Sequence, residues 1–82
     1  MDSKTAEHIK GLCTIYLTKY LINKFHITHE EAYKKLLNTE TYKLILDDNS
    51  NMFLESDLYL KEALDIEYTQ GKEAFYNYIT QE

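Results

Sequence analysis

This chain contains no Pro, Arg, Trp or Val, and its 82 residues include only two Gly and one Cys. The shortage of Pro and Gly excludes collagen-like chains and flexible linkers. A single cysteine, Cys13, has no intrachain partner, which excludes a disulfide scaffold and fits a reducing compartment. Nine Lys stand against fourteen acidic residues, for a net charge of −5. Because nucleic-acid-binding proteins are usually basic, direct nucleic-acid binding is not expected.

Long apolar runs are also missing. The longest uncharged run near the N-terminus, residues 11–18, has eight residues, whereas a bilayer needs about 20. Residues 1–7 lack the basic and then apolar order of a signal peptide. We therefore expect a cytoplasmic protein that does not contact a membrane.

Hydrophobic residues make up 44% of the chain and charged residues 28%, which is ordinary for a globular protein. The length suits one domain over residues 1–82 and allows burial of roughly 60% of the extended surface. Ligand pockets usually need several hundred Å³, so an enclosed catalytic cleft is hard to accommodate.

The first segment, about residues 3–25, has the periodicity of a long helix. Its apolar residues recur at steps of three and four in two adjacent stripes: Ile9, Cys13, Tyr16 and Tyr20 in one, Leu17, Leu21 and Phe25 in the other. Asp2 or Ser3 can cap its start. The polar remainder contains Lys10, Lys19 and Lys24.

A capping box, Thr28 with Glu31, predicts the start of a second helix after a tight turn. Its predicted apolar face consists of Ala32, Tyr33, Leu36 and Leu37. Asn38 and Thr39 interrupt the pattern, since both side chains compete for backbone hydrogen bonds. The sequence leaves a break and a bend open at this point, with a short helix over residues 40–46 beyond it.

Residues 47–51 predict a loop, and residues 52–54 are either extended or the start of a turn. Ser56 and Asp57 predict the start of a helix over about residues 57–68, and Gly71 predicts a left-handed helix end. A last helix follows over residues 72–79. The predicted fold is therefore all-α, a single small domain of four to five helices packed as a helical bundle.

Candidate chemical sites fail on inspection. Asp47, Asn49 and Asn51 match the start of a calcium loop, but Met52 replaces the required Gly and Leu58 the closing acid. His26 and His29 lack further soft ligands for zinc. Cys13 lies on an apolar stripe, where a thiol behaves as a small hydrophobe. We therefore expect no enzyme, no catalytic residue, no metal site and no cofactor.

A helix-turn-helix over residues 28–46 is one alternative, and it would make the chain a DNA-binding regulator. Ala32 fits the small residue of the first helix. However, Leu36 stands where the turn would need Gly, and Lys43 is the only basic residue of the second helix.

Charge is distributed unevenly along the chain. Residues 1–46 contain seven Lys and five acidic residues, whereas residues 47–82 contain two Lys and nine acidic residues. The eight Tyr include three on core stripes (Tyr16, Tyr20 and Tyr78), and tyrosine is enriched at interfaces. The leading hypothesis is a non-catalytic regulatory module that binds a basic protein surface through an acidic, Tyr-rich C-terminal face: Tyr59, Glu62, Asp65, Glu67, Tyr68 and Tyr76. The sequence leaves open whether these acids only keep the chain soluble.

Two further alternatives concern partners. Lys without Arg, together with abundant Tyr, Asn and Ile, is typical of AT-rich genomes and indicates a low-GC bacterium or its phage. An acidic protein from a phage or mobile element can mimic nucleic acid and inhibit a nuclease or another defence effector. A homodimer through residues 3–25 is also open, because so long an amphipathic helix has more apolar surface than a small domain covers.

Three stretches carry a resemblance to known proteins: Glu30–Leu37, Thr41–Asp47 and Leu54–Ser56. Together they resemble small uncharacterised all-helical proteins of low-GC bacteria, some of which lie near toxin–antitoxin or mobile-element genes. The likeness spans roughly residues 12–66. It implies a non-catalytic accessory or regulatory protein and carries over no active-site residue.

Overall fold

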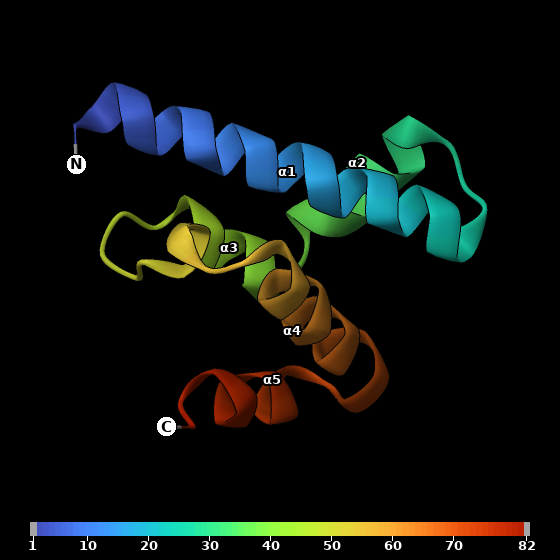
Figure 1. The fold of residues 1–82 in the computed structure, drawn as a ribbon. Helices are drawn as coiled ribbons and strands as arrows, with labels where there is room; N and C mark the ends of the chain where they lie inside the picture. Colours follow the sequence, from blue (N-terminus) through green and yellow to red (C-terminus); the bar gives the residue numbers. More distant parts are fainter. Residues whose placement is uncertain (1, 82) are drawn as a thin grey trace.

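The computed structural model describes residues 2–81, and over this range it contains five α-helices, one 3₁₀ turn and no strand (Figure 1). The helices are α1 (Ser3–Phe25), α2 (His29–Leu37), α3 (Glu40–Leu46), α4 (Asp57–Gln70) and α5 (Lys72–Ile79), with the turn η1 (Met52–Leu54) before α4. The radius of gyration is 12.3 Å, close to the roughly 12 Å expected for a compact domain of this length. The prediction of an all-α, single-domain helical bundle is confirmed.

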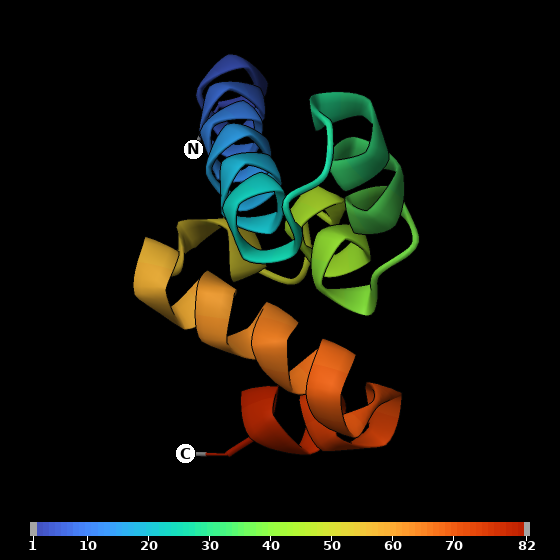
Figure 2. The ribbon, with the colours of Figure 1, turned by 90° about the vertical axis from the view of Figure 1, so that its right-hand side faces the viewer.

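Helix α1 runs the length of the molecule. At 1.5 Å per residue its 23 residues span about 34 Å, and the longest dimension of the fold is 36 Å. Helices α2, α3 and α4 pack along one side of it, and α5 packs on α4 on the side away from α1 (Figures 1 and 2). Within the described residues 2–81, no other helix packs on the opposite side of α1.

Side-chain caps set the starts of the first three helices. The Asp2 carboxylate accepts the Thr5 backbone N–H at 2.8 Å, and the Thr28–Glu31 capping box is present. Thr39 caps α3 by accepting the Tyr42 N–H at 3.1 Å. The chain therefore breaks at Asn38–Thr39 rather than bending, because the Thr39 side chain and backbone begin a new helix.

Helix α4 begins at the predicted cap, where Ser56 accepts the Tyr59 N–H at 3.1 Å. It continues two residues past the predicted end at Tyr68, since nothing stops it before Gly71. Gly71 has φ 94° and ψ 176°, so the predicted left-handed conformation is wrong in ψ. This region is essentially restricted to glycine, and the single residue both ends α4 and begins α5.

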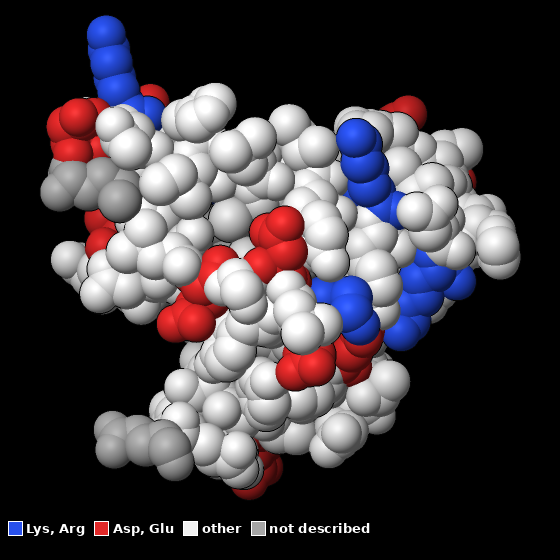
Figure 3. Space-filling view, in the orientation of Figure 1, with Lys and Arg blue, Asp and Glu red and all other residues white. Residues whose placement is uncertain are grey.

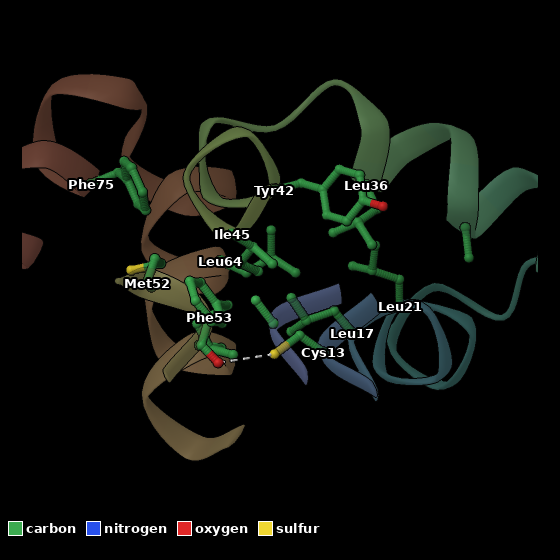
Figure 4. Close-up of a cluster of buried hydrophobic side chains, with 14 residues drawn as sticks. Cys13, Leu17, Leu21, Leu36, Tyr42, Ile45, Met52, Phe53, Leu64 and Phe75 are labelled. Atoms are coloured by element: carbon green, nitrogen blue, oxygen red, sulfur yellow. Dashed lines mark hydrogen bonds between the residues drawn. The ribbon is translucent and has the colours of Figure 1, made fainter. Parts of the chain in front are cut away.

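The core lies between the helices, and every helix contributes to it (Figure 4). The largest fully buried apolar side chains are Leu17, Leu21, Leu36, Ile45, Leu60, Leu64 and Phe75. In α2 only Ala32 and Leu36 are buried, whereas Tyr33 and Leu37 are exposed. The predicted four-residue face of α2 was therefore too wide, because this short helix packs on its neighbours along a narrower strip.

Lys10 was placed on the polar side of α1, and that prediction was wrong: only 8% of the residue is exposed. Its ammonium Nζ donates to the Leu46 carbonyl at 3.0 Å and binds the Asp48 carboxylate. The same atom lies 4.9 Å from the centre of the Phe53 ring. Lys10 thus attaches the loop between α3 and α4 to α1.

Within residues 2–81, no helix combines the length and the apolar character needed to cross a bilayer. In the same range, no three His, Cys, Asp or Glu side chains gather closely enough to hold a metal ion.

Candidate protein-docking surface

The six residues predicted to form an acidic, Tyr-rich face all lie on α4 and α5, but they do not point in one direction. Asp65 faces α1, Glu67 and Tyr76 face α3, and Tyr68 packs on the end of α1. Tyr59 and Glu62 share a neighbour, Tyr78 of α5, and Glu67 and Tyr76 share another, Glu40 of α3. The structure therefore forms two separate pairs among the six residues and no common face.

Asp65 is used to hold α4 against α1. Its carboxylate accepts hydrogen bonds from the Tyr20 hydroxyl at 2.5 Å and from the Lys24 ammonium at 3.0 Å, and Lys61 lies 3.5 Å away. Burial raises the pKa of Asp65, but these hydrogen bonds and lysine charges outweigh it and bring the pKa below its ordinary value. An acid satisfied in this way is a structural group rather than a free contact for a partner.

Glu67 and Tyr76 hold α4 and α5 against the start of α3. The Glu67 carboxylate accepts the backbone N–H groups of Glu40 and Thr41 at 2.7 and 3.0 Å. The Tyr76 hydroxyl donates to the Glu40 carboxylate at 2.8 Å, which raises the pKa of Tyr76. These two predicted site residues are likewise committed to contacts within the fold.

Tyr59, Glu62 and Tyr68 are nearer the surface. The Tyr59 and Tyr78 ring centres are 5.5 Å apart, and the Tyr78 hydroxyl donates to Glu62 at 2.9 Å. Tyr68 meets Phe25 edge to face, with ring centres 5.8 Å apart, at the other end of α4. The predicted face is thus divided into two small aromatic contacts at opposite ends of one helix.

An apolar hollow lies elsewhere, between α1 and the chain that leads into α4. We call it the α1–η1 groove, and its volume is about 530 Å³. Leu12 and Ile15 of α1 are 53% and 52% exposed beside it, and Leu54 on the facing wall is 51% exposed. Leu58, at 60%, follows on the first turn of α4. The other residues that line the α1–η1 groove are Ile9, Cys13, Tyr16, Lys19, Phe53, Glu55 and Asp57.

The rim of the α1–η1 groove carries opposite charges on its two walls. Lys19 lies on the α1 wall, and Glu55 and Asp57 lie on the wall that leads into α4. Across residues 2–81 none of these three side chains takes part in an ion pair. In Figure 3, carboxylates gather where α4 begins, below a band of uncharged atoms along α1. These acids are free to meet a cation from outside.

Cys13 forms part of the floor of the groove. It is buried, and its Sγ lies 3.5 Å from the Phe53 carbonyl oxygen (Figure 4). Burial raises the pKa of the Cys13 thiol, and the nearby Asp57 charge raises it further. A thiol held in its neutral form behaves as an apolar wall residue rather than as a nucleophile.

The sequence interpretation assigned no role to Leu12, Ile15, Leu54 or Leu58. A signal was present for the first two, since both fall outside the two apolar stripes of residues 3–25 and make the helix apolar on more than one side. No local signal marks Leu54 and Leu58, because their exposure beside an apolar surface depends on how α1 packs against the chain that leads into α4.

Comparison with known proteins adds no assignment: no protein-family model, curated sequence or solved structure matches this chain.

Proposed function

We propose that this chain is a non-catalytic regulatory module that binds a protein partner through the α1–η1 groove. The observation that carries the proposal is the half exposure of Leu12, Ile15 and Leu54 around one hollow. Contiguous exposed apolar surface that is rimmed by charge marks an interaction site more often than a free surface.

The unpaired Glu55 and Asp57 indicate the chemistry of the partner. A side chain bearing Lys or Arg, placed over them, would gain a charge-assisted contact without displacing an internal ion pair. The hypothesis of a partner with a basic surface is thus kept, while the contact residues move from α4–α5 to the groove. Such charges mainly improve specificity and the rate of encounter, whereas apolar anchors supply most of the affinity.

The two alternative functions find less support in the geometry. Mimicry of nucleic acid needs an array of free carboxylates, but Asp48 and Asp65 bind lysines of the chain and Glu67 binds α3. A helix-turn-helix over residues 28–46 would place the start of α3 against DNA. That helix start is instead covered by the Glu67 carboxylate.

Photo-crosslinking in the native cells tests the proposal. A benzophenone amino acid at position 54 is expected to form protein adducts, whereas the same group at position 37 is not. Leu37 is a matched control, because it is an exposed leucine on α2 outside the groove. Any protein captured is then purified and titrated against the wild type, Leu54→Lys and Leu37→Lys. Equal adducts from both positions, or equal affinities of both variants, would contradict the proposal.

A further inference from the structure

We infer that the groove is occupied by a second copy of this chain, in a two-fold pair in which α1 of each copy lies antiparallel in the groove of the other. This inference rests on the proposed function, since it uses the same docking surface and names its occupant. Three features of the chain fit a second copy: the apolar residues of α1, the charges of the two walls and their register along the helix.

Helix α1 is apolar on two sides. Leu17 and Leu21 on the inner side are fully buried, while Leu12 and Ile15 on the outer side are half exposed. A helix that is apolar all round is normally covered all round. No other element of the described chain covers the outer side of α1 (Figures 1 and 2), so a second molecule has to supply the cover.

The charges of the groove are self-complementary. One wall offers a free cation, Lys19, and the other offers free carboxylates, Glu55 and Asp57. In a two-fold interface the same surface of each copy meets that of the other. A surface with a cation on one side and carboxylates on the other then forms the same ion pair at two symmetry-related places. The charges of the whole chain are distributed in the same way as those of the two walls: Lys is concentrated in residues 1–46, which include α1, and acids in residues 47–82, which include the facing wall.

The register of the two helices follows from their spacing. If the two-fold axis of the pair passes midway between Leu12 and Ile15, Leu12 of each copy lies against Ile15 of the other. Antiparallel helices then bring Lys19 of the second copy to the level of His8 and Ile9. Ile9 lines the groove together with Leu54 and Glu55, and in this register we expect the Lys19 ammonium of one copy to meet the Glu55 carboxylate of the other.

Sedimentation velocity over a range of concentrations tests the pair directly. The wild type is expected to sediment as a dimer of 9.8 kDa chains. Ile15→Lys is expected to be monomeric with unchanged helicity, because position 15 is half exposed in the single chain. The matched control Leu37→Lys is expected to dimerise like the wild type. A monomeric wild type, or a dimer unaffected by Ile15→Lys, would overturn the inference.

Charge reversal tests the register. Lys19→Glu and Glu55→Lys are each expected to weaken dimerisation by about tenfold or more, since like charges then face each other. The double variant, with both changes in one chain, is expected to recover most of the loss. Failure of this rescue would contradict the proposed register. A monomeric wild type that still forms adducts with a different protein from position 54 would refute the second copy while supporting the proposed function.

Discussion

The Glu67 carboxylate of α4 accepts two hydrogen bonds from Thr41 at the start of α3, one from its backbone N–H at 3.0 Å and one from its hydroxyl at 2.8 Å. The first turn of a helix leaves N–H groups without partners inside the helix. Thr39, the cap residue directly before α3, satisfies one of them, and Glu67 satisfies two more from another helix. The contact therefore joins a local helix cap to the packing of α3 on α4.

Glu67→Ala is expected to lower the free energy of unfolding by about 1–3 kcal/mol, because two partly buried N–H groups lose their acceptor. Urea denaturation followed by circular dichroism measures the loss. Glu7→Ala, at an exposed position of α1, is the matched control and is expected to change stability by less than about 0.5 kcal/mol. Equal effects of the two variants would show that the cap contributes nothing.

Lys10→Met is expected to destabilise the fold by about 1–2 kcal/mol, since the methionine keeps the apolar stem but leaves the Leu46 carbonyl without its donor. Amide hydrogen exchange should accelerate most in residues 47–54, the segment that Lys10 holds. Lys4→Met, at an exposed position, should leave that exchange unchanged. Uniform acceleration along the chain would contradict a local role.

The Asp65 cluster predicts how stability depends on pH. The pKa of Asp65 is lowered in the folded state, so its contribution is present above the unfolded value near 3.8 and is lost as pH falls through the folded value. Hydrogen bonding to Asp65 raises the pKa of Lys24, and burial raises that of Tyr20, so their contributions are lost as pH rises above about 10. We expect a stability plateau from about pH 5 to 9, with losses on both sides.

Asp65→Asn separates this cluster from other acids. Glu31 and Glu40 also have lowered pKa values, through hydrogen bonds from Thr28 and from Lys43. The variant should therefore be less stable at neutral pH and lose less stability between pH 5 and 3 than the wild type. Chemical denaturation measures the free energy of unfolding at each pH. If the variant loses as much stability between pH 5 and 3 as the wild type, Asp65 does not contribute to the acid dependence.

Replacing each of the two glycines by alanine is expected to change the stability of the fold in opposite directions. Gly71→Ala should destabilise by about 1–3 kcal/mol, because φ 94° is strained for any residue with a Cβ. Gly11 lies inside α1, and an alanine Cβ there would meet no other part of the fold within 4 Å, so Gly11→Ala should stabilise the monomeric fold by about 0.5–1 kcal/mol. Thermal melts of the two variants at a single low concentration provide the comparison. Any gain from Gly71→Ala would contradict the assigned backbone.

The helix starts were predictable because their signals are local. Thr28 and Glu31 satisfy each other within four residues, and Ser56 caps α4 in the same way. The break at Asn38–Thr39 could not be decided from sequence, since the Thr39 cap competes with continuation of α2. What decides it is Glu67, which meets the new helix start from 26 residues away along the chain.

Side-chain roles were less predictable than helices. Periodicity places Lys10 on the polar side of α1, and its burial is explained by the Leu46 carbonyl and the Asp48 carboxylate, which lie 36 and 38 residues away along the chain. Asp65 and Glu67 look like free surface acids in the sequence, because the hydroxyl and N–H groups that bind them come from α1 and α3. The groove depends on η1 lying beside α1, which no local pattern of residues 52–58 indicates.

The attachment of the α3–α4 loop by Lys10 has a consequence for association. Phe53 lies under the Lys10 ammonium, and its carbonyl oxygen faces the Cys13 thiol. The wall that carries Leu54 is thus ordered before any partner arrives. An incoming surface does not have to freeze a flexible loop, so less conformational entropy is lost on binding. Association should then proceed at rates typical of rigid docking, about 10⁵–10⁷ M⁻¹s⁻¹, and Lys10→Met should slow it.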